Sequence, residues 1–253
     1  MTNKYTPEII FLLLVIALSV TGFSSLFTGQ HAERTAYQYL HIVTSFAWLL
    51  LLLVQLLLIR QGSGPRHRAV GQCIFFAGPV LVASLTLLTV HSAVKDAEVG
   101  KADFMVVQNV MVTLELALLI FLAFVLRKNR RVHGALLLST TLLFMGIALF
   151  FTLISYVPGY VVSGPGTFSR FAEAAQMVAY VGGVIALLFF LKNRSTGWPW
   201  LLTGSFFFLN GFLQMIAARM NGTKPLTSLV ASIGRVPAFV LGLLVFGALI
   251  WLA

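Results

Sequence analysis

The sequence predicts an all-α integral membrane protein in which eight transmembrane helices form one bundle. Of its 253 residues, 59% are hydrophobic and only 9% are charged, whereas a soluble domain has about 25% charged residues. Apolar runs of about 20 residues, the length that crosses a ~30 Å hydrocarbon core, recur along the whole chain. These observations exclude a water-soluble fold and predict a single transmembrane domain over residues 1–253.

The apolar runs place the spans in order along the chain. We expect them at about residues 8–27, 37–59, 69–93, 104–126, 134–157, 171–191, 198–218 and 229–252. The first run is long for a signal peptide and has no clear small-x-small cleavage site, so we interpret it as an uncleaved helix.

Three short basic loops set the predicted orientation. They follow the second, fourth and sixth spans, and their basic residues are Arg60, Arg66 and Arg68, then Arg127, Lys128, Arg130 and Arg131, then Lys192 and Arg194. Because loops rich in Lys and Arg remain on the cytoplasmic side, we expect both termini in the cytoplasm. The spans joined by these loops form three helical hairpins flanked by single helices. A shared Lys-Asn-Arg core at 128–130 and 192–194 is consistent with internal duplication, although any cytoplasmic loop tends to be basic.

The charge and cysteine content exclude further classes of function. The net charge of +10 falls mainly in short loops at helix ends, where Lys and Arg contact lipid head groups. We therefore expect the lipid bilayer as partner, and no nucleic acid. Cys73 is the only cysteine, which excludes an intrachain disulfide, and we expect it to be buried. No Walker A loop, dinucleotide fingerprint or His-Glu-x-x-His motif occurs.

Polar side chains within the spans recur at helical spacing. Four spans place them on one helix face each: His41, Trp48 and Gln55; Gln108 and Glu115; Glu173, Gln176 and Tyr180; Thr203, Asn210 and Gln214. Because lipid cannot satisfy polar groups, these faces should point into the bundle. Most of them fall in the outer half and, with Arg219 and Arg235, predict a polar pocket open to the outer face. The alternative is that uncharged polar residues only join helices by hydrogen bonds.

Glu115 is the one acidic residue expected near the bilayer midplane. It lies about halfway between Asp103 and Arg127, and no Lys or Arg lies at matching depth in another span. An ionisable group at that depth is expensive and usually functional. We expect it to be protonated, or hydrogen-bonded to a partner such as Asn210. A proton or ion relay, a substrate contact and a purely structural hydrogen bond all remain open.

Four histidines lie at the predicted membrane boundaries. His41 and His91 fall near the outer surface, and His67 and His133 near the inner surface. Paired imidazoles could ligate heme iron, and His41 with His91 could instead bind copper or zinc. The alternative is that these histidines only anchor the chain at the head groups or form hydrogen bonds.

Short motifs over about residues 37–157 resemble a known family. The residues that carry the resemblance are His41, Trp48, Gln55, the Arg66-His67-Arg68 loop before Gly71, and Arg130-Arg131-x-His133. They resemble poorly characterised bacterial inner-membrane proteins that are similar to di-heme cytochromes of the b561 type. The resemblance implies heme b, with His67 and His133 as the inner ligand pair. The outer pair departs from the plan, because the fourth span offers Gln108 and Asn109 where a histidine is expected.

Three functions follow as expectations. The resemblance implies a heme-binding redox or oxidase-assembly protein of the bacterial inner membrane. Glu115 and the outer polar faces instead favour a proton-coupled small-molecule transporter. The polar groups could also contact partner subunits, which would make the chain a non-catalytic part of a larger membrane complex. The sequence does not decide whether the protein is an enzyme.

Overall fold

We describe the fold from a computed structural model, which covers residues 5–28, 35–100, 104–162, 167 and 169–253. The elements in these ranges are helices, with no strand among them: α1 (Thr6–Thr28), α2 (Ala36–Arg60), α3 (Gly64–Gly71), α4 (Ile74–Glu98), α5 (Phe104–Val125), α6 (Arg130–Tyr156), α7 (Ser169–Lys192), α8 (Trp198–Arg219), α9 (Thr223–Ser232) and α10 (Arg235–Leu252). Eight helical segments are long and apolar enough to cross a bilayer. The prediction of an all-α bundle of eight transmembrane helices is confirmed.

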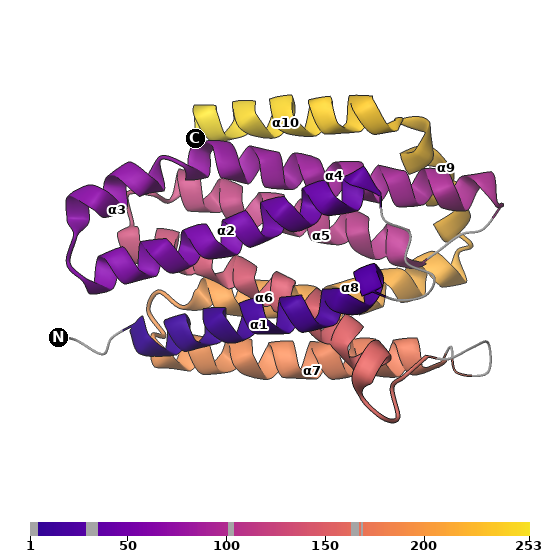
Figure 1. Cartoon of the computed structure of the whole chain (residues 1–253), viewed down its shortest axis with the longest axis horizontal. Helices are drawn as coiled ribbons and strands as arrows, with labels where there is room; N and C mark the ends of the chain where they lie inside the picture. The colour runs from indigo at the N-terminus through magenta and orange to yellow at the C-terminus, as the bar shows by residue number, and fades with distance from the viewer. Residues whose placement is uncertain (1–4, 29–34, 101–103, 163–166, 168) are drawn as a thin grey trace.

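The three predicted hairpins are present in the packing. Helix α2 packs on α4, α5 on α6, and α7 on α8. The flanking helices are added to the outside, with α1 on α6 and α10 on α4. The start of α1 and the C-terminal end of α10 lie at the same end of the bundle as α3, whereas α9 lies at the opposite end (Figure 1). We refer to these as the inner and outer ends, following the positive-inside rule.

One predicted boundary is wrong, and another span is divided between two helices. The last span was expected from residue 229, but α9 ends at Ser232 and α10 begins only at Arg235. Gly234 between them has φ +77°, a left-handed conformation that glycine adopts without steric cost, so the chain turns there. The third span, expected at 69–93, lies within the candidate span Gly64–Glu98. Its first residues belong to the short helix α3, which has no buried residue, and the rest to α4. The spanning helix is α4.

The junction between α3 and α4 also corrects the expectation for Cys73. This thiol is exposed rather than buried. It precedes α4, and Phe75 and Phe76 in the first turn of that helix are exposed as well. Its exposure follows from its place at the rim of the bundle.

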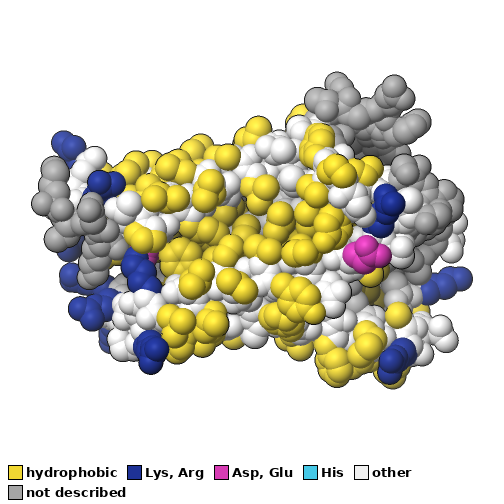
Figure 2. Space-filling view, turned by 90° about the horizontal axis from the view of Figure 1, so that it is seen from below, with side chains coloured by type: hydrophobic (Ala, Val, Ile, Leu, Met, Phe, Trp, Pro, Cys, Tyr) yellow, Lys and Arg dark blue, Asp and Glu magenta, His cyan; other side chains and the backbone are white. Residues whose placement is uncertain are grey.

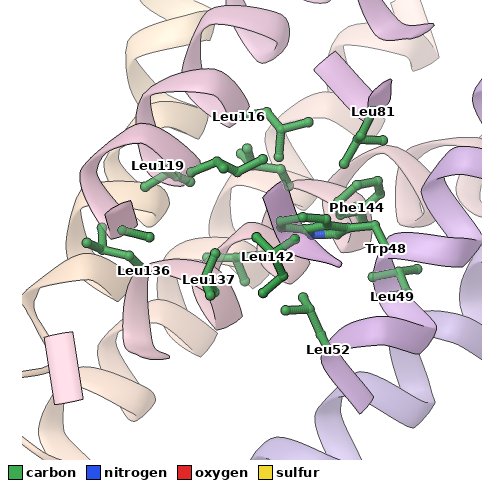
Figure 3. Close-up of a cluster of buried hydrophobic side chains, with 14 of the residues drawn as sticks. Trp48, Leu49, Leu52, Leu81, Leu116, Leu119, Leu136, Leu137, Leu142 and Phe144 are labelled. Atoms are coloured by element: carbon green, nitrogen blue, oxygen red, sulfur yellow. The ribbon is translucent and has the colours of Figure 1, made fainter. Parts of the chain in front are cut away.

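The centre of the bundle is a dry cluster contributed by several helices. Trp48 of α2 has no exposed surface and lies with Leu81 of α4, Leu116 of α5, and Leu142 and Phe144 of α6 (Figure 3). These helices belong to two different hairpins, so the cluster joins the hairpins to each other. The packing leaves little freedom for side chains at the core.

The outward faces of the spans are apolar, as a lipid-facing surface requires. Leu14 of α1, Leu188 of α7 and Leu244 of α10 are each more than 60% exposed. Figure 2 shows the consequence on one side of the molecule, where a wide hydrophobic band separates Lys and Arg side chains at the two ends. Such a surface would aggregate in water, and the protein is a multi-pass membrane protein.

Candidate functional site

The buried carboxyl of Glu115 meets the side chain of Asn210 between α5 and α8. Each residue lies near the middle of its helix, and each is at least 96% buried, with 4% and 3% of its surface exposed. Asn210 Nδ2 donates a hydrogen bond to Glu115 Oε2 over 3.2 Å. The expected pairing of these two residues at the midplane is therefore present, and it joins the second hairpin to the third.

The hydrogen-bond inventory of this pair indicates a protonated carboxyl. Glu115 Oε1 and Asn210 Oδ1 are both buried without a hydrogen-bond partner. When the carboxyl is ionised, both oxygens are hydrogen-bond acceptors only, so neither can donate a hydrogen bond to the other. A protonated Glu115 carboxyl has an O–H group, which can donate a hydrogen bond to an oxygen such as Asn210 Oδ1. Among the described residues no Lys or Arg forms an ion pair with Glu115, and an unpaired charge buried there would be costly.

A second polar contact lies between the same two helices, nearer the outer end. Gln214 Nε2 donates to Gln108 Oε1. Gln108 is seven residues before Glu115, and Gln214 is four residues after Asn210, so the two antiparallel helices bring both pairs into register. We call Gln108, Glu115, Asn210 and Gln214 the polar ladder. It runs from the outer half to the midplane, where the sequence predicted a polar pocket.

Within the polar ladder, Glu115 and Asn210 are buried, whereas Gln108 and Gln214 are partly exposed. An open depression of about 600 Å³ lies at the outer end, lined by Ala218, Asn221, Thr223, Lys224, Pro225 and Ser228. None of the ladder residues lines it. Further inward on α8, Thr203 is buried and donates to Pro199 O of its own helix. Glu115 and Asn210 therefore form a packed polar contact, and a pocket open to the outer face stays a prediction.

The polar face of α2 points inward, as predicted, and begins with His41. His41 Nδ1 lies 3.2 Å from Ser84 Oγ of α4, and His41 Nε2 lies 3.4 Å from Ser45 Oγ. Thr44 Oγ1 lies 2.7 Å from the same Ser84 hydroxyl. Both ring nitrogens of His41 are therefore in contact with hydroxyl groups. Ser84 was missed at the sequence level, because a single serine in an apolar span carries no spacing signal.

Trp48 and Gln55 continue this face and contact two further helices. Trp48 Nε1 donates to Thr140 Oγ1 of α6 over 3.0 Å. The amide of Gln55 is satisfied when its oxygen accepts from Gly71 N at 2.8 Å and its nitrogen donates to His67 O at 3.1 Å and to His67 Nδ1. Trp48, expected in the pocket, is instead a buried link between α2 and α6. These contacts fit the helix-joining alternative for uncharged polar residues.

The two outer histidines are not arranged as a ligand pair. The His91 ring packs on Tyr37 with centroids 4.9 Å apart, whereas His41 contacts Ser84, seven residues or about 10 Å along α4 from His91. Helices α2 and α4 pack directly on each other, and a porphyrin between their histidines needs them apart. No group of three His, Cys, Asp or Glu side chains in the described ranges could hold a metal ion. Copper, zinc and outer heme therefore gain no support.

The two inner histidines differ in their hydrogen bonds. His133 Nδ1 donates to Ala123 O over 2.7 Å, which leaves Nε2 with a free lone pair, as in a metal-bound histidine. His67 Nδ1 accepts from Gln55, so its proton is on Nε2. Burial, and then the nearby His133, lower the pKa of His67. With its proton on Nε2, His67 is not prepared to bind iron in this arrangement, so the inner heme pair gains no support from these contacts.

Glu173 and Gln176 do not join the polar ladder. Both are exposed on the outward face of α7, and Gln176 Nε2 donates to Tyr180 OH over 3.0 Å. The buried face of α7 is instead the run of small residues that includes Ala174 and Gly182. The buried residues of α7 recur every four positions, and this spacing in the sequence would have identified the packing face.

The two arginines expected in the pocket lie at the outer end. Arg219 ends α8 and is exposed. Arg235 begins α10, with its guanidinium carbon 5.9 Å from the centroid of the Tyr37 ring. Neither reaches the polar ladder. Tyr37, which spacing alone did not identify as a site residue, contacts both the His91 ring and the Arg235 guanidinium.

Comparisons with known protein families, with curated proteins and with solved structures find no match to this chain. The resemblance to b561-type cytochromes is neither confirmed nor refuted by them. Any function must therefore be argued from the site itself.

Proposed function

We propose that the protein is a proton-coupled small-molecule carrier of the bacterial inner membrane, in which Glu115 binds and releases the proton. The observation that carries the proposal is the pair of buried, unpartnered oxygens on Glu115 and Asn210 at the middle of their helices. Burying a carboxyl at this depth without a cation costs free energy. A purely structural position could be filled by leucine without that cost, so the carboxyl indicates a functional role.

The position of the pair supports a coupling to movement. Glu115 belongs to the α5–α6 hairpin and Asn210 to the α7–α8 hairpin, so a displacement of one hairpin against the other changes the contact. Carriers built from hairpins use such displacements to alternate access to a site near the midplane. Loss of the proton leaves a charge that only water, a cation or a polar substrate can stabilise. Deprotonation therefore favours an opened interface.

The outer half of the interface supports an approach from the outer side. Gln108 and Gln214 place amide groups between the outer end and Glu115. Amides can hydrogen-bond to water or to a polar solute when the helices separate. Inward of the pair, Thr203 hydrogen-bonds to its own helix, so the inner half of α8 offers fewer polar contacts in this conformation.

Proton flux in liposomes tests the proposal. The purified protein is reconstituted with a pH dye inside, and an imposed pH gradient is combined with a panel of small anions, amino acids and sugars. At least one solute should move protons with the wild-type protein, and Glu115→Gln should abolish this flux while keeping the side-chain shape. Glu173→Gln is the matched control, because it makes the same change on the exposed face of α7. Flux by Glu115→Gln equal to wild type at every pH contradicts the proposal.

A second candidate function is that of a subunit in a membrane complex, and the outward face of α7 favours it. Glu173, Gln176 and Tyr180 are exposed there at spacings of three and four residues. The Gln176 amide is satisfied by Tyr180, but no described residue pairs with the Glu173 carboxyl. Glu173 lies about one helical turn inward from the outer end of α7. A Lys or Arg at the same depth on a partner helix would neutralise its carboxylate.

Native mass measurement in mild detergent tests this second candidate. We expect a complex larger than one chain for the wild-type protein and its loss in a Glu173→Leu, Gln176→Leu variant. Leu187→Val, on the same face of α7 but nearer the inner end, is the control that should keep the complex. Isolation of the wild-type protein as a stable single chain contradicts this candidate.

A further inference from the structure

Three helices bring aromatic and cationic side chains together at the outer end of the bundle. Tyr37 lies in the first turn of α2, His91 in the outer part of α4, and Arg235 at the first position of α10. The Tyr37 and His91 rings are 4.9 Å apart, and the Arg235 guanidinium carbon lies 5.9 Å from the Tyr37 centroid. We call these three residues the outer cluster.

Among the described residues, the guanidinium of Arg235 has no anionic partner. No carboxylate among the described residues forms an ion pair with it, and its Nε is buried without a hydrogen-bond acceptor. The ring of Tyr37 attracts the positive charge, but a ring face does not replace the in-plane acceptors for which the five N–H groups are arranged. A buried donor left without an acceptor is costly. An oxyanion from outside the described residues would supply such an acceptor together with a charge opposite to that of the guanidinium.

The backbone beside Arg235 adds donors of the same kind. The residue before the helix is Gly234, whose φ of +77° turns the chain into α10 and whose missing side chain provides no cap. The N–H groups of Arg235 and Val236, which precede Pro237 in this 18-residue helix, therefore receive no hydrogen bond from an N-cap side chain. A helix start carries partial positive charge and favours anions. Arg235 stands at that start, so side chain and backbone present donors at one place.

We propose that the outer cluster is a binding site for a phosphate group, held by Arg235 and the start of α10 against the Tyr37 ring. Phosphate offers enough acceptor oxygens for the guanidinium fork and the backbone together. At a membrane boundary the phosphate can belong to a lipid head group or to a small soluble molecule. The site lies apart from the polar ladder and does not rest on the proton-coupled function.

Ligand-dependent thermal unfolding tests the site, because a ligand that binds the folded state raises its unfolding temperature. The protein is purified in a maltoside detergent, which has no phosphate, and titrated with inorganic phosphate or with short-chain phosphatidylglycerol. Short-chain diacylglycerol, which lacks the phosphate, is the lipid control. We expect a phosphate-bearing probe to raise the unfolding temperature. A response to inorganic phosphate assigns a soluble ligand, and a response to phosphatidylglycerol alone assigns a lipid head group.

Variants connect the response to the outer cluster. Arg235→Gln should raise the apparent dissociation constant at least tenfold, whereas Arg219→Gln removes an exposed arginine at the same end and should leave it unchanged. If Arg235→Gln does not fold, Arg235→Lys keeps the charge without the fork and should still weaken binding several-fold. No response to either probe, or equal responses from the wild-type protein and the folded Arg235 variants, overturns the proposal.

Discussion

Trp48 Nε1 donates a hydrogen bond to Thr140 Oγ1 over 3.0 Å at a place where neither side chain has exposed surface. The Thr140 hydroxyl also lies 2.6 Å from Leu137 O, to which it donates its own proton. Thr140 therefore accepts from the indole and donates to its own helix at the same time. This contact joins α2 to α6, two helices from different hairpins that share few other contacts.

Replacing Thr140 by valine should destabilise the protein. The shape is kept, but the indole N–H loses its acceptor in a dry core, and we expect the free energy of unfolding to fall by about 1–2 kcal/mol. Thr140→Ser keeps the hydroxyl that accepts from the indole, so its free energy of unfolding should fall by less. Denaturant unfolding in detergent micelles measures both variants. A valine variant as stable as the wild-type protein would show that the hydrogen bond contributes nothing net.

A second prediction concerns Phe207, whose ring fits between two glycines. A Cβ atom added to Gly182 of α7 would lie 2.5 Å from the ring, and one added to Gly146 of α6 would lie as close on another side. Gly182→Ala should therefore force the ring or the helix to move and reduce stability by about 1–3 kcal/mol. Thermal unfolding measures the loss, and Phe207→Leu in the same chain should recover part of it.

The control for this prediction is a glycine with open space around it. Gly211 of α8 has no atom within 4 Å of the added Cβ. Gly211→Ala should be neutral or stabilise the helix by up to about 1 kcal/mol, because alanine has the higher helix propensity. Equal losses for Gly182→Ala and Gly211→Ala would show that packing against Phe207 is not the cause.

The fold could be predicted from the sequence because the bilayer imposes its constraints residue by residue. Long apolar runs and basic loops identify spans and hairpins without any knowledge of packing. The missed start of the last span lies where that constraint is weak, at the edge of the membrane. Gly234 turns the chain by its backbone conformation, and hydrophobicity carries no information on φ.

The candidate site was predictable only in part. The partnership of Glu115 with Asn210 followed from depth, because a carboxyl at the midplane needs a polar neighbour. The orientation of α7 could not be predicted from the sequence. Glu173 and Gln176 have the same helical spacing whether their face points into the bundle or towards lipid. Which face packs is decided by small residues such as Gly182 meeting the side chain of Phe207, and that depends on the neighbouring helix.

The pH dependence of stability should reveal His67. Burial, and then the nearby His133, lower the pKa of His67 below its ordinary 6.5. The unfolded chain takes up a proton near that value and the folded chain only at lower pH, so stability contributed by neutral His67 is present above about pH 6.5 and lost as the pH falls through the lowered pKa. Unfolding temperatures of wild-type protein and His67→Gln, measured over this range, should differ in slope. Parallel curves would contradict the prediction.

The absorption spectrum tests whether the histidines hold heme. We expect protein purified from heme-replete cells to show no Soret band, because His41 is held by Ser84 and Ser45 and His67 has its proton on Nε2. A band that disappears in both His41→Ala and His133→Ala would contradict this expectation and support the b561 resemblance. Helices α2 and α4 would then have to separate to admit a porphyrin, since they pack directly on each other here. His133 is the ring best prepared for a metal, because its Nδ1–H is fixed on Ala123 O.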